Sequence, residues 1–132
     1  MSIFTNWPGL ITGKFLSDFN QIVEPYDFIR QENEHFKRVL LKESTTPKPI
    51  DLVISHHIPS YDLVHPTFKN SIINCYFVGD VEVPLNIKAW IYGHTHKKKN
   101  DTINGCNFVC NPFGYPNEVE PYWQVEVLEI NS

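Results

Sequence analysis

Two short apolar runs, residues 50–55 (IDLVIS) and 87–93 (IKAWIYG), each end directly before histidines. Their length and β-branched content predict two strands, the first of the kind that a parallel sheet buries on both faces. Ahead of the first run, apolar positions at helical spacing predict a helix over residues 27–43, which the proline-containing stretch 44–49 ends. A helix combined with buried strands of this kind predicts an α/β fold.

The rest of the chain is assigned by the same patterns. Strand character is also present in three further segments, residues 3–7, 107–111 and 123–130. Residues 97–104 are expected to form a polar turn. Residues 71–83 (SIINCYFVGDVEV) are apolar enough for either a helix or a strand, and we favour a helix. No repeat or long linker divides the chain, so we expect a single unit.

Composition argues against several classes of protein. Eleven Lys and Arg residues against fifteen Asp and Glu give a formal net charge of -4, which disfavours nucleic acid or an anionic membrane as the main partner. No apolar stretch approaches the roughly 20 residues of a membrane helix, and the first ten residues lack a signal-peptide pattern. We therefore expect a cytoplasmic protein. Three cysteines without a C-x-x-C pair predict buried thiols rather than disulfides.

The histidines that follow the apolar runs are the candidate functional residues. Side chains two positions apart on an extended chain face the same side, so His94 and His96 are expected to point together and the neighbours His56 and His57 to diverge. Sites in open α/β sheets form beyond the carboxyl ends of strands. Neutral imidazole binds zinc, iron, manganese or nickel. The pattern therefore indicates a metal site at His56, His94 and His96, three ligands that suffice for one zinc ion.

Three motifs, in this order, resemble those of the C-terminal half of calcineurin-like metallophosphoesterases. They are VISHHIPS (53–60), the Gly-His-x-His motif in WIYGHTH (90–96), and CNPFGY (110–115), which is similar to the Asn-Pro-x-Gly-Tyr segment of one bacterial-type branch. The resemblance implies a two-sheet sandwich flanked by helices. Residues 1–132 would then be a single incomplete domain, its C-terminal portion, with a mixed sheet and flanking helices.

The resemblance also implies an activity, the metal-dependent hydrolysis of a phosphoester. Enzymes of this family hold two divalent ions about 3.5–4 Å apart, which clamp the phosphate and activate water. The ions expected here are manganese, iron or zinc. By correspondence of motifs, His56 and His94 would share one ion, His96 would bind the other, and His57 would lie near the phosphate as the candidate catalytic residue.

The chain departs from the family pattern in its carboxylates. The Asp-x-His, Gly-Asp-x-x-Asp and Gly-Asn-His motifs of the family are absent from the sequence, and Phe113 stands where the branch usually has arginine. Two dications held only by neutral donors repel each other strongly. Two functions follow: a hydrolase segment that needs a complementary N-terminal half-domain, or a non-catalytic remnant or binding module with at most one weak metal site.

Overall fold

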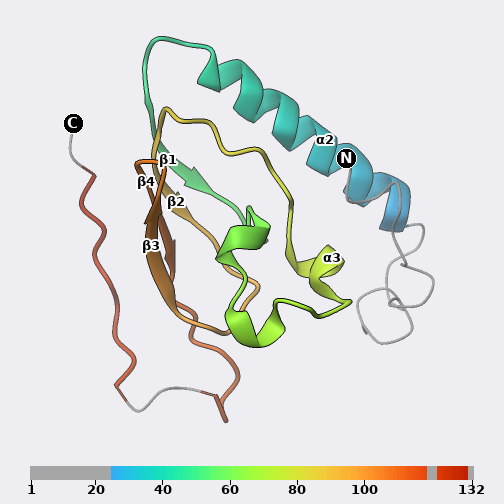
Figure 1. The fold of residues 1–132 in the computed structure, drawn as a ribbon, viewed down its shortest axis with the longest axis vertical. Coiled ribbons are helices and arrows are strands. Elements are labelled where there is room, and N and C mark those ends of the chain that lie inside the picture. The colour runs from blue at the N-terminus through green and yellow to red at the C-terminus, as the bar shows by residue number, and fades with distance from the viewer. Residues whose placement is uncertain (1–24, 119–121, 131–132) are drawn as a thin grey trace.

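The structure, a computed structural model, describes residues 25–118 and 122–130 and has an α/β arrangement of one sheet and few helices (Figure 1). Its strands are β1 (Ile50–Ile54), β2 (Ile87–Ile91), β3 (Lys99–Ile103) and β4 (Cys106–Cys110). Its helices are α2 (Pro25–Ser44), α3 (Asn74–Phe77) and two single 3-10 turns, Tyr61–Leu63 and Pro66–Phe68. The described residues contain no helix with the length and apolar character needed to cross a bilayer.

The four strands form one mixed sheet in the order β1-β2-β4-β3. β1 pairs in parallel with β2, and β2 in parallel with β4, whereas β3 runs antiparallel to β4. The turn between β3 and β4 contains Asn104 and Gly105, both with positive φ (51° and 81°). Asn-Gly with two positive φ angles is a favoured two-residue hairpin turn, because its twist matches that of the strands.

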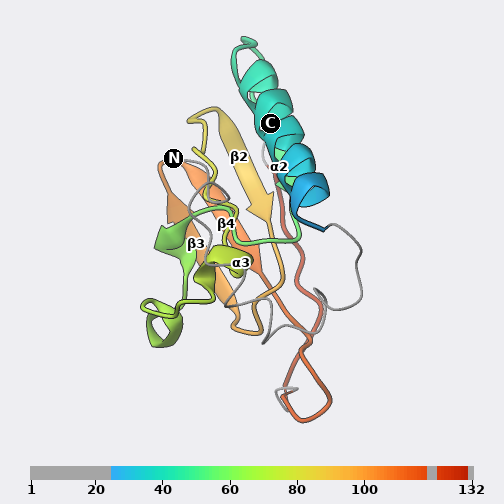
Figure 2. The same cartoon turned by 90° about the vertical axis from the view of Figure 1, so that its right-hand side faces the viewer.

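Helix α2 confirms the helix predicted over residues 27–43 and extends it by one or two residues at each end. It lies along one face of the sheet (Figure 2). On its inner side Leu40 is buried, and the rings of Phe36 and Trp90 are in a T-shaped arrangement with their centroids 6.2 Å apart. Three hydroxyl side chains at its end donate to carbonyls that have no partner within the helix; the pairs are Ser44 with Leu41, Thr45 with Lys42, and Thr46 with Glu43.

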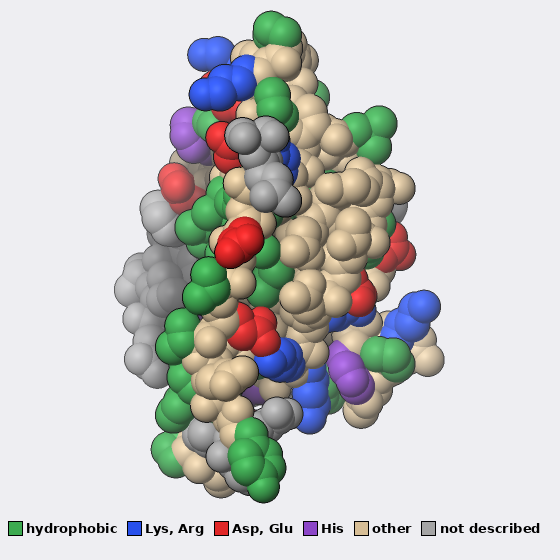
Figure 3. Space-filling view, turned by 90° about the vertical axis from the view of Figure 1, so that its left-hand side faces the viewer, with side chains coloured by type: hydrophobic (Ala, Val, Ile, Leu, Met, Phe, Trp, Pro, Cys, Tyr) green, Lys and Arg blue, Asp and Glu red, His purple; other side chains and the backbone are tan. Residues whose placement is uncertain are grey.

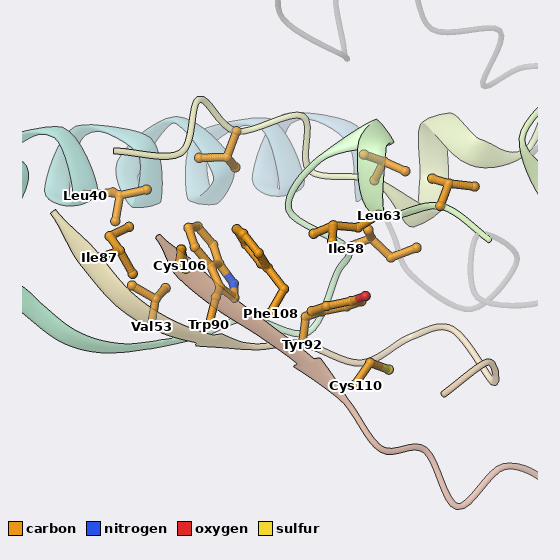
Figure 4. Packing of buried hydrophobic residues seen from close by; sticks show 13 residues of the cluster. Leu40, Val53, Ile58, Leu63, Ile87, Trp90, Tyr92, Cys106, Phe108 and Cys110 are labelled. Atoms are coloured by element: carbon orange, nitrogen blue, oxygen red, sulfur yellow. The ribbon is translucent and has the colours of Figure 1, made fainter. Parts of the chain in front are cut away.

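The core lies between the sheet and the segments that cover it, which are α2 and the chain between β1 and β2 (Figure 4). The strand register places Val53, Trp90 and Phe108 side by side on the inner face, and all three are buried. Trp90 and Phe108 stack with ring centroids 6.0 Å apart. Because these large side chains come from adjacent strands, the core fixes the register that brings the strand ends together.

Several expectations are wrong in detail. β1 is an edge strand, and it is not buried on both faces, since its side chains Leu52 and Ile54 are 38% and 67% exposed. The polar turn predicted at residues 97–104 is largely β3, a strand that the Asn-Gly hairpin signal indicates. The helix favoured over residues 71–83 is confined to the four residues of α3.

The segment 123–130 also differs from its prediction, because it makes no strand pairing in the sheet. It borders a cavity with β2 and β4, and its side chains Val125 and Val127 are exposed. The face of the molecule that carries the C-terminal segment shows hydrophobic side chains along one margin and basic and histidine side chains at its lower end (Figure 3). The strand predicted at residues 3–7 lies outside the described residues.

The three cysteines are free thiols, as expected. Cys106 and Cys110 are buried at the two ends of β4, and burial raises the pKa of each to about 11. Cys75 is half-buried in α3. A thiol with a raised pKa is a poor nucleophile at neutral pH, so Cys106 and Cys110 act as small apolar side chains in the core.

We expect Phe108→Ala to lower the free energy of unfolding by about 3–5 kcal/mol, because it leaves a cavity beside Trp90 in the only extensive core of the described residues. Urea unfolding followed by tryptophan fluorescence measures the change. The control is Leu85→Ala, at a side chain that is 79% exposed, which should stay within about 0.5 kcal/mol of the parent. Equal effects of the two substitutions would contradict the core assignment.

Candidate metal centre

The carboxyl ends of β1 and β2 carry the two histidine loops to one place. Ile54 and Ile91 are partners at the ends of these parallel strands. Beyond them, the Ser55 amide donates to the Ile91 carbonyl (3.0 Å) and the Gly93 amide donates to the His56 carbonyl (3.1 Å). Parallel pairing therefore continues past both strands and ties the loop at His56 to the loop that enters His94.

Three imidazoles converge at this point. His56, His57 and His94 each offer a ring nitrogen, and these atoms all lie within 4.8 Å of one another. His56 Nε2 and His94 Nδ1 lie 2.9 Å apart. The ring centroids are separated by 5.0 Å (His56–His57), 4.8 Å (His56–His94) and 4.7 Å (His57–His94). We call these residues the three-histidine group.

The composition of this group differs from the geometric expectation for two reasons. His56 and His57 follow β1 in a bend rather than an extended chain, so the neighbours do not diverge, and both reach His94. His94 has φ +61°, a left-handed conformation that turns the chain away from the line of β2. His94 and His96 therefore do not act as neighbours on one face of a strand, and His96 lies outside the group.

A partly buried hydrogen-bond chain holds the first histidine loop. The Trp90 indole Nε1–H donates to Ser55 Oγ (2.9 Å), and the same hydroxyl donates to the His57 carbonyl (2.8 Å). Ser55 thus connects the largest side chain of the core to the backbone of the histidine loop. A hydroxyl that both accepts and donates fixes both partners, so the position of the loop depends on the core.

The environment of His57 favours the neutral imidazole. Burial, and then the neighbouring His56, hold the pKa of His57 below its usual value. Tyr76 and Phe77 of α3 add an aromatic wall, with the Phe77 ring 4.5 Å and the Tyr76 ring 5.1 Å from that of His94. A neutral imidazole in a partly dry setting is the form that binds metal ions.

His96 belongs to a second cluster. Its Nδ1 lies 2.6 Å from Glu118 Oε2. The rings of His96 and Tyr115 are in a T-shaped arrangement with their centroids 4.7 Å apart. The backbone N–H of Tyr115 (3.1 Å), and to a smaller extent His96, lower the pKa of Glu118. Glu118 is a functional candidate that sequence reasoning missed, since a lone glutamate 22 residues beyond His96 carries no motif signal.

Both clusters border one cavity of about 830 Å³. His56 and His94 line it together with His96 and Glu118, while the aromatic residues Tyr76, Phe77, Phe113 and Trp123 form much of the remaining wall. Lys97 and Lys98 also border the cavity, and Lys98 pairs with Glu126. The cavity therefore combines imidazoles, a carboxylate and cationic side chains, a lining suited to a polar anionic ligand.

The donor set of the three-histidine group fits one divalent ion of borderline softness. In tetrahedral zinc sites the Zn–N bonds of about 2.0–2.1 Å place ligand nitrogens about 3.3 Å apart. The His56–His94 pair, at 2.9 Å, needs to open by only a few tenths of an ångström. The group contains no carboxylate to neutralise a second dication, so these three residues by themselves fit one ion and not two.

Comparison with known proteins adds one relative. The chain is 28% identical over 116 residues to an uncharacterized protein of Acanthamoeba polyphaga mimivirus. The alignment covers 79% of this chain and 41% of the viral protein, so the chain spans about two fifths of the length of that relative. No family model and no solved structure matches the chain.

We expect the chain to bind one Zn²⁺ ion per molecule and His56→Ala to weaken binding by more than about tenfold, because even loss of an outer contact to a metal ligand has that effect. Isothermal titration calorimetry at neutral pH measures the affinity. The matched control is His35→Ala, an exposed histidine in α2 that should leave the affinity unchanged. Equal affinities for the two variants would contradict the site.

Ser55→Ala should affect both stability and metal binding. It leaves the buried Trp90 N–H without its acceptor, a loss of about 1–3 kcal/mol in the free energy of unfolding. It also releases the His57 carbonyl, so Zn²⁺ affinity should fall by about 10-fold or more. Urea unfolding and calorimetry give the two values. A variant that is destabilised but binds Zn²⁺ normally would show that the hydrogen-bond chain serves the core alone.

Proposed function

We propose that this chain is a segment of a metal-dependent phosphoester hydrolase and contributes histidine ligands to its metal centre. The observation that carries the proposal is the convergence of His56 and His94 from the ends of two parallel strands, with Lys97 bordering the same cavity. This arrangement supports the correspondence between the two histidine motifs and those of calcineurin-like metallophosphoesterases. Substrates in this class carry a phosphate in ester linkage.

The residues of the chain have distinct parts in this proposal. His56 and His94 hold one ion, and His57, whose ring lies within 5.0 Å of both, is either a third ligand or a contact to the phosphate. His96 faces the cavity from the Glu118 side and is available for a second ion or for the substrate. When bound, the metal supplies Lewis-acid polarisation of the phosphoester and activation of water.

The two-ion centre requires groups beyond those of this chain. A bridging carboxylate offsets the repulsion between two dications, and the three-histidine group contains none. We propose that a complementary half-domain with the acidic and Asn-His motifs completes the centre and covers the exposed side of β1, where Leu52 and Ile54 are unburied. That partner would also complete the calcineurin-like sandwich, of which this chain has one mixed sheet and its flanking helices.

A second candidate function is favoured by the absence of a carboxylate from the three-histidine group. In that case the chain is a binding module that holds a single ion through His56, His57 and His94 and catalyses no reaction. The two functions differ in a measurable way. The hydrolase requires turnover that depends on these histidines, whereas the binding module requires one bound ion without turnover.

The test is a hydrolysis assay with p-nitrophenyl phosphate and its bis ester in Mn²⁺, Fe²⁺ or Zn²⁺. The chain is assayed alone and with a polypeptide that carries the Asp-x-His, Gly-Asp-x-x-Asp and Gly-Asn-His motifs. We expect the complemented protein to hydrolyse at least one ester and His94→Ala to reduce the rate by at least about 100-fold, because it removes a ligand. The control His35→Ala should retain the rate.

Two results would reject the hydrolase. One is the absence of metal-dependent turnover in the complemented protein while the chain binds a single ion, which supports the binding module. The other is turnover that His94→Ala leaves unchanged, since that activity would not arise from the centre described here.

A further inference from the structure

The His96–Glu118 contact joins two loops that are distant in sequence. His96 follows β2 and Glu118 lies in the segment after β4, yet the ring nitrogen Nδ1 and the carboxylate oxygen are 2.6 Å apart. Both side chains are partly exposed, at 37% and 41%, and both border the cavity. Such a short contact between side chains 22 residues apart is favoured when the backbone holds Glu118 in place.

The turn at residues 114–118 provides that support. The Glu118 amide donates to the Tyr115 carbonyl (2.8 Å), and the Tyr115 amide donates to Glu118 Oε2 (3.1 Å), so the two residues bind each other reciprocally. Gly114 has φ +75°, and a Cβ at this position would lie 3.2 Å from Glu118 Cβ and 3.3 Å from its Oε2. Glycine therefore permits both the turn and the close approach of the carboxylate.

The contact determines which ring nitrogen His96 offers to a ligand. A carboxylate accepts hydrogen bonds, so in the neutral form of the ring the partner atom Nδ1 carries the proton, and Nε2 keeps its lone pair. The hydrogen bond at one ring nitrogen sets the role of the other, and a carboxylate partner also makes the ring a stronger base. The Tyr115 ring, edge to face with His96, restricts rotation of the imidazole.

We propose that Glu118 is a positioning residue that, held by the Gly114–Tyr115 turn, fixes His96 as the Nδ1–H tautomer with Nε2 available to the cavity. The use of this nitrogen in phosphoester hydrolysis rests on the proposed function, whereas the tautomer does not. Glu118 acts through His96 and not on the substrate. Its removal should therefore change the tautomer of His96 while the fold is retained.

The experiment is NMR of the metal-free 132-residue chain labelled with ¹⁵N-histidine. The chain has six histidines, and the signals of His96 are those lost in His96→Gln. We expect His96 to be the Nδ1–H tautomer in the parent and to shift towards Nε2–H in Glu118→Ala. Glu118→Gln should restore the parent tautomer in part, because the amide oxygen also accepts a hydrogen bond. The control Glu126→Ala removes a nearby glutamate that pairs with Lys98 and should leave His96 unchanged.

Glycine substitutions give a second, independent test. Gly105→Ala and Gly114→Ala both place a side chain at positive φ, with a strain of about 1–2 kcal/mol, but only the added Cβ at position 114 meets Glu118. We expect Gly114→Ala to shift His96 towards the Nε2–H tautomer and Gly105→Ala to leave the His96 tautomer unchanged. The proposal is overturned if His96 is Nε2–H in the parent, or if its signals are the same in Glu118→Ala as in the parent.

Hydrolysis of p-nitrophenyl phosphate by the complemented protein separates this proposal from the proposed function. A tautomer that depends on Glu118, without turnover in any variant, supports the positioning role and rejects the hydrolase. A parent tautomer retained in Glu118→Ala rejects the positioning role, whatever the rate of hydrolysis.

Discussion

The parallel pairing of β1 with β2 is the constraint on which the candidate site depends. Ile54 and Ile91 end the two strands side by side, and two more backbone hydrogen bonds extend the pairing to His56 and Gly93. Strands that run in the same direction have their carboxyl ends at one edge of the sheet, so His56 and His94, which are 38 residues apart in sequence, meet there. This pairing is therefore what places His56 Nε2 and His94 Nδ1 2.9 Å apart.

The core and the site are linked through Trp90. Its ring stacks on Phe108 of the neighbouring strand and contacts Phe36 of α2, so it joins helix and sheet in one packed cluster. Its indole N–H donates a hydrogen bond to the Ser55 hydroxyl, which in turn donates one to the His57 carbonyl. A polar group this deeply buried must be satisfied, and here its satisfaction also positions a histidine loop. The packing that stabilises the sheet thereby pre-organises the three-histidine group.

The sequence predicted the elements whose pattern is local. The amphipathic spacing of α2 and the short apolar runs of β1, β2 and β4 were sufficient to predict these four elements. Each of these patterns depends on residues near one another in the chain. β3 could also have been predicted, because Asn104-Gly105 is a hairpin signal. Its polar side chains instead led to the prediction of a turn. The segment 123–130 has a strand-like alternation yet finds no pairing partner among the described strands, and pairing is not a local property.

For the site, local sequence was enough to show the residue types and their position at strand ends, from which His56, His94 and His96 were predicted as ligands of a metal ion. How the histidines are grouped depends on the folded loops. A bend places His57 with His56 and His94, the left-handed backbone of His94 separates it from His96, and a turn built on Gly114 brings Glu118 to His96. Periodicity assumes a regular backbone, and these loops are irregular because long-range hydrogen bonds and packing, rather than local preference, set their dihedral angles.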